Sequence, residues 1–241
     1  MNDKVGISVI TVVRDGVLHL EGTITSVIKN KARSKIEYIV IDGGSTDGSL
    51  DIVKKYADHI SYWESEPDSG IYDAMNKGWN AAADRNFVLF LGSGDRLISL
   101  PDSIWSYDCN DVLYGDVLMG EKRVFNARAD YHLKLYNSLH HQALLVNKAI
   151  HPGPPFNQNY RVYADFDFNQ RLMKKGVRFV YLPQFVTYAY PGGVSDKQDF
   201  SESLRIIRNN FGLFWMLLAL AGKSAMNIFP LLKRLRPFRE V

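Results

Sequence analysis

The stretch that decides the fold is Glu37-Tyr-Ile-Val-Ile-Asp-Gly-Gly-Ser-Thr-Asp-Gly-Ser49, in which a short apolar run leads directly into a polar, glycine-rich loop. The run from Tyr38 to Ile41 has the composition of a strand buried on both faces, which is typical of a mostly parallel sheet. Open α/β sheets bind their ligands outside the carboxyl ends of the strands, which is where Asp42 lies. The stretch therefore predicts an α/β sheet with a binding site beside Asp42.

The same loop also has an ordinary interpretation. Asp, Gly, Ser and Thr are common turn residues, and Ser45, Thr46 or Asp47 could cap the helix that the apolar pattern of residues 49–57 predicts. Loop composition alone is a weak indicator of function, so these residues by themselves leave both interpretations open.

Strand-like runs alternate with helical patterns through the first half of the chain, which is typical of βαβ units. The expected strands are residues 5–13, 38–41, 60–63 and 87–91, and the expected helices are residues 18–28, 49–57 and 71–83. The second half predicts a hairpin from 112–118 and 123–125, a strand at 143–146, a helix at 165–175, and strands at 177–182 and 185–190. We expect one open, mostly parallel, Rossmann-like sheet domain over residues 1–195 and a helical appendage over residues 196–241.

The composition is that of a globular protein in a reducing compartment. The 241 residues are 46% hydrophobic and 23% charged, which is close to the globular average and excludes a disordered chain. The only cysteine, Cys109, excludes an internal disulfide framework and a cysteine-based zinc site. The apolar residues 5–13 end at Arg14-Asp15 without a cleavage pattern, so we interpret them as a strand and expect a cytoplasmic protein.

Four motifs follow one another in the first hundred residues: Ile7-Ser-Val-Ile-Thr11, Val40-Ile-Asp-Gly-Gly-Ser-Thr-Asp-Gly-Ser49, Ser65-Glu-Pro-Asp-Ser-Gly-Ile-Tyr-Asp-Ala-Met-Asn-Lys-Gly78 and Phe90-Leu-Gly-Ser-Gly-Asp95. In this order they resemble the family 2 glycosyltransferases of the GT-A fold. The resemblance covers about residues 5–100 and resumes at His141-Gln142 and at residues 163–167. The stretch from Pro67 to Gly78 is similar to the bacterial branch that builds exopolysaccharide and lipopolysaccharide, including the colanic-acid type enzymes.

The resemblance implies an enzyme that moves a sugar, with inversion, from a nucleotide-sugar to an acceptor hydroxyl in cell-surface polysaccharide biosynthesis; we expect a UDP-sugar. Direct displacement needs a general base for the hydroxyl and positive charge for the departing diphosphate. The resemblance implies that Asp165 is the base, although Ala164 replaces the glutamate that usually precedes it. Asp167 could instead cap or pair within the helix. The ordinary alternative is that both aspartates only favour a helix N-terminus.

The resemblance also implies a divalent metal, Mg²⁺ or Mn²⁺. Relatives commonly carry an Asp-any-Asp motif after the fourth strand, whereas Gly92-Ser-Gly-Asp95 leaves Asp95 as the only carboxylate there. Magnesium can be held by one or two carboxylates together with diphosphate oxygens and water, so Asp95 could suffice.

Further residues are implied at the donor site. By the resemblance, Thr11 and Asp42 contact base and ribose, Asp73 and Asn76 line the donor pocket, Ser93 lies beside the diphosphate, and His141 contacts the acceptor or the diphosphate. The alternative for Asp73 and Asn76 is that they satisfy backbone groups near a helix start, and for His141 it is a structural hydrogen bond.

The C-terminal segment concentrates both apolar character and positive charge. Residues 211–222 carry no charge, and all of the net charge of +3 lies in the segment after residue 221, which has five basic residues and one acidic residue. A bilayer-spanning helix needs about 20 apolar residues, so this run favours a helix lying on an anionic membrane surface, which would suit a lipid-linked acceptor. The alternatives are packing on the catalytic domain or a homodimer interface. Nucleic-acid binding is not expected, because the basic excess is confined to a hydrophobic tail.

Two other classes of protein are alternatives to this enzyme. The reduced aspartate motif is compatible with a non-catalytic nucleotide-sugar binding or scaffold protein that retains the GT-A fold, whereas the presence of Asp165 favours an enzyme. A nucleotidyltransferase is a third class, but the chain lacks the glycine-rich N-terminal phosphate loop of such enzymes.

Overall fold

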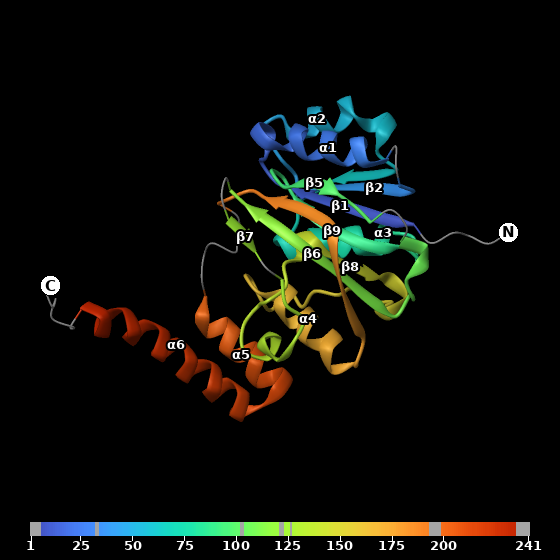
Figure 1. Ribbon diagram of the computed structural model, residues 1–241. Coiled ribbons are helices and arrows are strands. Elements are labelled where there is room, and N and C mark those ends of the chain that lie inside the picture. The colour runs from blue at the N-terminus through green and yellow to red at the C-terminus, as the bar shows by residue number, and fades with distance from the viewer. Residues whose placement is uncertain are drawn as a thin grey trace, which may run out of the picture.

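The computed structural model describes residues 6–31, 34–101, 104–120, 123–125, 127–192 and 199–234. The strands of this part of the chain form one nine-stranded sheet in the order β3-β2-β1-β4-β8-β6-β9-β5, with β7 paired to β6 beside this row. Helices α1 and α2 cover one face of the sheet, and α3 and α4 cover the other (Figure 1). The predicted fold class, an α/β sheet flanked by helices, is confirmed.

The elements have the following bounds. The strands are β1 (Ile7–Val13), β2 (Ile36–Asp42), β3 (Tyr62–Ser65), β4 (Phe87–Gly92), β5 (Arg96–Ser99), β6 (Asp111–Met119), β7 (Arg123–Phe125), β8 (Leu144–Asn147) and β9 (Arg178–Ala189). The helices are α1 (Val17–Lys31), α2 (Ser49–Lys55), α3 (Ile71–Ala81), α4 (Ala164–Lys174), α5 (Phe200–Phe211) and α6 (Leu213–Arg234).

The first half of the sheet is parallel, as the alternating pattern predicts. Strand β1 pairs in parallel with β2 and β4, and β2 pairs in parallel with β3. All residues of β1 are buried, because helices cover both of its faces. The carboxyl ends of four strands therefore meet at one edge of the sheet. Helix α3 lies so close to β1 that a Cβ at Gly78 would overlap Ile10.

The second half of the sheet mixes parallel and antiparallel pairs, and it differs from the predicted strands in two places. Strand β8 runs antiparallel to β4 and β6, and the expected hairpin of β6 and β7 is confirmed. The two strands predicted at 177–182 and 185–190 are one strand, β9, whose pairing with β6 shifts register between Tyr114 and Asp116 and so accommodates Pro183. Strand β5 was not predicted, because four residues containing an arginine and a serine carry little strand signal.

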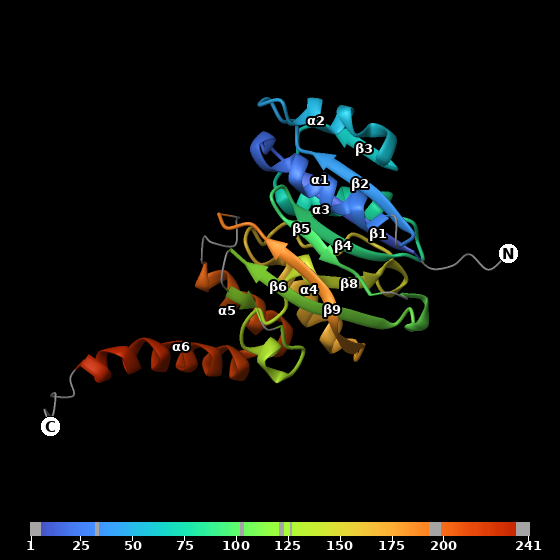
Figure 2. The same cartoon turned by 45° about the horizontal axis from the view of Figure 1, so that its top comes forward.

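Helices α5 and α6 continue the packing of α4. They are separated by Gly212, whose φ of +89° is a left-handed conformation that favours glycine. Ile206 and Ile207 of α5 are buried in the same hydrophobic core as α3 and α4, whereas α6 extends away from the body of the molecule (Figure 2). The predicted boundary at 195/196 falls at residues outside the described ranges, so the division into two domains stays a prediction. Among the described helices, none is both long and apolar enough to cross a bilayer.

Candidate active site

The loops that follow β1 and β2 are held together by hydrogen bonds. The backbone N–H of Asp15 donates to Ser45 Oγ over 2.8 Å, and the N–H of Thr46 donates to Asp15 Oδ1 over 2.8 Å. Asp15 has a φ of +50°, which is uncommon for a residue with a side chain and indicates that its conformation is imposed by these contacts. The glycine-rich loop thus forms one wall of the edge together with the first loop.

Asp47 of this loop accepts backbone N–H groups at the start of two helices. Asp47 Oδ2 accepts the N–H of Val17 over 2.9 Å, at the start of α1. Helix α2 itself begins after Gly48, which makes no side-chain cap bond. Asp47 Oδ1 also accepts the N–H of Ser49, the first residue of α2, over 2.9 Å, so Asp47 bonds to the start of both helices.

Asp42 and Thr11 are fully buried. The carboxylate of Asp42 accepts from Ser65 Oγ over 2.6 Å, from the N–H of Ser45 over 3.1 Å, and from the Ser45 hydroxyl. Thr11 Oγ1 lies 3.0 Å from the hydroxyl of the buried Tyr38. Both side chains are enclosed and organise the wall from inside.

Two other residues implied at the donor site, Asp73 and Asn76, also have structural partners. Asp73 accepts from the N–H of Ser69 and from Gln158 Nε2, each over 3.0 Å, and the Ser69 N–H lowers the pKa of this carboxyl. The amide of Asn76 forms two hydrogen bonds with the backbone of Phe156, of 2.8 and 3.0 Å. The Asp73 contact is the structural alternative, a bond to a backbone group near a helix start, whereas Asn76 bonds to a loop 80 residues away.

Ser93 lies at the end of β4 and joins two loops of the edge. Its Oγ donates to the carbonyl of Gly16 over 3.1 Å, and its N–H bonds to the Val12 carbonyl over 3.2 Å. It is half-buried and holds the first loop in place.

Asp95 is buried beneath the same edge. Its Oδ2 accepts the N–H of Gly92 over 2.7 Å and its Oδ1 accepts the N–H of Tyr190 over 2.9 Å. Burial raises the pKa of Asp95, and the two N–H groups oppose that effect. These two bonds leave part of the acceptor capacity of the carboxylate unused.

The metal expectation can be tested against this donor set. In the described part of the chain no three His, Cys, Asp or Glu side chains are grouped to hold a metal ion. One carboxylate fits a hard cation only when diphosphate oxygens and water complete the coordination. Asp95 therefore fits a metal that binds together with a donor substrate, and does not fit a metal held by the protein alone.

Asp165 lies in the first turn of α4 beside four polar partners, one of which is the Tyr72 hydroxyl, 3.5 Å from its Oδ1. Its Oδ2 is 3.2 Å from His141 Nδ1 and accepts from Asn137 Nδ2 over 3.3 Å, while its Oδ1 accepts the N–H of Phe166 over 2.7 Å. Burial opposes ionisation, but the hydrogen bond and positive charge of His141 outweigh it and hold the pKa of Asp165 below its ordinary value. Asp165 is thus a buried carboxylate that stays ionised.

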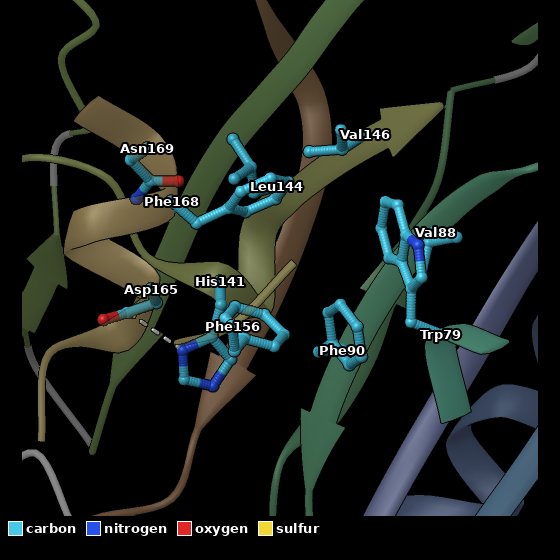
Figure 3. Close-up of a pocket in the computed structure, with 10 residues that line it drawn as sticks. All are labelled: Trp79, Val88, Phe90, His141, Leu144, Val146, Phe156, Asp165, Phe168 and Asn169. Atoms are coloured by element: carbon cyan, nitrogen blue, oxygen red, sulfur yellow. Dashed lines mark hydrogen bonds and ion pairs between the residues drawn. The ribbon is translucent and has the colours of Figure 1, made fainter. Parts of the chain in front are cut away.

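The pair Asp165 and His141 lies at one end of a pocket with apolar walls (Figure 3). The walls come from α3, β4, β8, the loop before α4, and α4 itself; the lining residues are Trp79, Val88, Phe90, His141, Leu144, Val146, Phe156, Asp165, Phe168 and Asn169. Asn169 Oδ1 is buried and accepts no hydrogen bond from the described residues. The low polarity of these walls strengthens the interaction between the carboxylate and the imidazole.

The His141-Gln142 pair connects the two buried carboxylates. His141 contacts Asp165, and its charge also lowers the pKa of Asp95. The Gln142 side chain lowers the pKa of Asp95 through a hydrogen bond. The structure therefore brings Asp95, His141 and Asp165 into one electrostatic unit, whereas Thr11, Asp42, Asp73 and Asn76 belong to the surrounding walls.

Glu202 of helix α5 was not among the predicted site residues, although it supports the segment that carries Asp165. Its buried carboxylate accepts three consecutive backbone N–H groups, those of Arg161, Val162 and Tyr163, over 2.7 to 2.9 Å. These residues immediately precede α4. Glu202 therefore fixes the segment that leads into the turn carrying Asp165. Asp167, in contrast, pairs with Arg171 over 2.8 Å and accepts from Asn210 over 3.0 Å, as a structural residue would.

Comparison with known proteins supports the class that the fold and site indicate. Residues 8–95 match the family model described as glycosyl transferase family 2. A relative from Mycobacterium bovis, named as a PGL/p-HBAD biosynthesis glycosyltransferase, is 33% identical over 147 residues, which are 56% of this chain and 57% of the relative. The chain thus spans a little over half the length of this relative. The more specific exopolysaccharide branch is not confirmed.

Solved glycosyltransferase structures share the fold. Staphylococcus aureus TarS 1-349 in complex with UDP-GlcNAc superposes with a TM-score of 0.64 at 18% identity, over 85% of this chain and 66% of that one. The mannosyltransferase PcManGT from Pyrobaculum calidifontis, in complex with GDP-Man and Mn²⁺, superposes with a TM-score of 0.57 at 17% identity, over 93% of this chain and 76% of that one. The GT-A fold is therefore confirmed.

We predict that Glu202→Gln lowers the free energy of unfolding by about 2 kcal/mol, because an amide cannot accept all three N–H groups and leaves a buried donor unpaired. Urea denaturation measures the loss, and hydrogen exchange should accelerate at residues 161–163. Glu21→Gln, which alters an exposed pair with Lys55, is the matched control and should change stability little. Equal effects of the two substitutions would contradict this role of Glu202.

Proposed function

We propose that this protein is an inverting glycosyltransferase that transfers a sugar from a nucleotide-sugar to an acceptor hydroxyl, with Asp165 as the general base. The observation that carries the proposal is the Asp165–His141 pair at the end of the pocket, within a GT-A fold. A carboxylate that is buried and yet ionised at neutral pH is suited to accept a proton from a hydroxyl brought against it.

The residues around Asp165 supply orientation. His141 and Asn137 both donate to Oδ2, which leaves Oδ1 to accept the proton of the acceptor hydroxyl. Oδ1 already accepts the Phe166 N–H over 2.7 Å and lies 3.5 Å from the Tyr72 hydroxyl. As the acceptor oxygen bonds to the anomeric carbon, the bond to the diphosphate oxygen breaks and the proton passes to the carboxylate. His141 keeps the Asp165 side chain in position through its hydrogen bond to Oδ2.

For the donor we propose a UDP-sugar, bound along the wall built from Thr11, Asp42, Asp73, Asn76 and Ser93. The support is the resemblance of the motifs and the nucleotide-sugars present in the related structures, UDP-GlcNAc in TarS and GDP-Man in PcManGT. The buried groups among these residues would act by holding the loops that contact the nucleotide.

We also propose that Mg²⁺ or Mn²⁺ binds with the donor, with Asp95 as the protein carboxylate. Such an ion supplies positive charge to the departing diphosphate when bound. PcManGT was solved with Mn²⁺ and GDP-Man together, which supports a shared requirement in this fold.

The acceptor is proposed to be a saccharide or lipid-linked saccharide of a cell-surface polysaccharide or glycolipid, reached by a cytoplasmic protein bound peripherally to the inner face of the membrane. The M. bovis relative is named for PGL/p-HBAD biosynthesis, which supports a biosynthetic glycosyl transfer without identifying the acceptor of this chain. A homodimer is the alternative use of the apolar C-terminal helix.

We predict that a UDP-sugar raises the melting temperature of the protein and that the rise is larger with Mn²⁺ than with a chelator, because a ligand that binds the native state stabilises it. The measurement is a thermal-shift screen of UDP, GDP and their sugars with and without Mn²⁺. A response to a GDP-sugar alone would contradict the proposed uracil nucleotide, and no response to any nucleotide would contradict the proposed function. Binding without detectable transfer would favour the scaffold alternative.

We predict that Asp165→Asn retains the donor-induced thermal shift and lowers transfer by about 10² to 10⁴-fold, the usual contribution of a general base. Asp167→Asn, two residues further along α4, is the matched control. The folded variant should keep its activity because Asp167 pairs with Arg171 and does not line the pocket. Unchanged turnover in Asp165→Asn would rule out this assignment.

We predict that His141→Ala moves the acidic limb of the pH profile of kcat/KM to higher pH. Burial raises the pKa of Asp165, and the contact with His141 lowers it; removing His141 leaves burial less opposed, so the pKa rises. The ionised base is then lost at a higher pH as the solution is acidified. A fall in rate with no displacement of the acidic limb would show that His141 does not control the ionisation of Asp165.

A further inference from the structure

The outward face of α6 is apolar over the first turns of the helix. Five large side chains are between 41 and 71% exposed there, namely Leu213, Phe214, Leu217, Leu218 and Leu220. With 3.6 residues per turn these positions fall on one side of the helix, and Trp215, Met216 and Ala219 fall on the other. No charged residue interrupts the face between Leu213 and Gly222.

The opposite side of α6 is held against the protein. Trp215 and Met216 pack on the hydrophobic core and Ala219 is buried, while the Lys134 ammonium lies 4.6 Å from the centre of the Trp215 ring. The Lys223 ammonium lies 3.5 Å from the ring centre of Phe200 on α5. A helix that is apolar on all sides is normally buried, so the outward face requires a partner.

The charge of the C-terminal region identifies the kind of partner. Between Glu202 and Glu240 the chain has no acidic residue and seven basic ones: Arg205, Arg208, Lys223, Lys233, Arg234, Arg236 and Arg239. A second copy of the chain brings no acidic residue from this region to complement these charges. A surface of anionic lipid offers both an apolar layer and negative charge.

We propose that α6 is an interfacial anchor, with Leu213, Phe214, Leu217, Leu218 and Leu220 inserted at the headgroup–acyl boundary of an anionic membrane. The inference deepens the proposed membrane location and rests on the proposed function for its purpose, which is to bring the pocket to a lipid-linked acceptor. Binding of the protein to the membrane does not depend on the proposed transferase activity.

The anchor is connected to the site through two sets of contacts. Lys134, which contacts Trp215, precedes Asn137 in the segment that reaches Asp165. Helix α5, joined to α6 at Gly212, donates from Asn210 to Asp167 and Gln170 of α4 over 3.0 and 3.1 Å. A membrane-bound α6 therefore holds α4 in a defined orientation to the lipid.

The test is co-sedimentation of the full chain with vesicles of phosphatidylcholine alone or with about one third phosphatidylglycerol, without donor or acceptor. We expect binding to the anionic vesicles that weakens as salt is added, and a loss of at least about tenfold in Phe214→Ser/Leu217→Ser. A variant with Lys233, Arg234, Arg236 and Arg239 changed to Gln should bind more weakly than the unaltered chain and with less dependence on salt. Leu18→Ser, on the exposed surface of α1, is the matched control and should bind as the unaltered chain does.

Two outcomes would overturn the proposal. Equal sedimentation of Phe214→Ser/Leu217→Ser and the unaltered chain would exclude the face as the anchor. A dimer by light scattering that fails to bind vesicles, and becomes monomeric in the same variant, would make the face a contact between two copies. The donor-induced thermal shift is measured on the same samples, so a failure of vesicle binding is separable from a failure of the proposed function.

Discussion

The backbone pairing of β1 between β2 and β4 is the constraint on which the rest of the structure depends. Parallel pairing places the carboxyl ends of these strands at one edge, and full burial of β1 fixes its register because a slip of one residue would exchange its two buried faces. The loops at this edge then have little freedom. Their polar side chains bond to one another, and the spacing of the strands sets how far apart the loops lie.

The site opposite this wall depends on electrostatics in an apolar setting. Asp95 and Asp165 are both buried, yet their pKa values move in opposite directions, because Asp165 has His141 beside it and Asp95 is dominated by burial. Environments that separate the ionisation of two carboxyls allow them to take different tasks in one reaction. The His141-Gln142 pair touches both, so a change at this pair alters the two carboxyls together.

The parallel half of the fold was predictable because its signals are local: β-branched runs, helical periodicity and glycine-rich ends. The second half was less so, since the register shift opposite Pro183 and the short strand β5 depend on pairing between distant residues. At the site, the resemblance pointed to Asp165 and His141, and the structure places them in contact. The sequence could not show that Asn76 pairs with the Phe156 backbone, or that Glu202 reaches residues 161–163, because a side chain's partner 40 or 80 residues away leaves no local pattern.

The position of Glu202 in the chain has a consequence for how the protein is made. The three N–H groups that it accepts belong to residues about 40 positions earlier, so a growing chain exposes them before their acceptor exists. Strands β1 to β4, which pair in parallel, can associate while synthesis continues, because they lie within the first 92 residues. The turn that carries Asp165 is completed only when α5 has left the ribosome and packed on α4. The scaffold for the donor would thus form early, and the proposed base would become fixed near the end of folding.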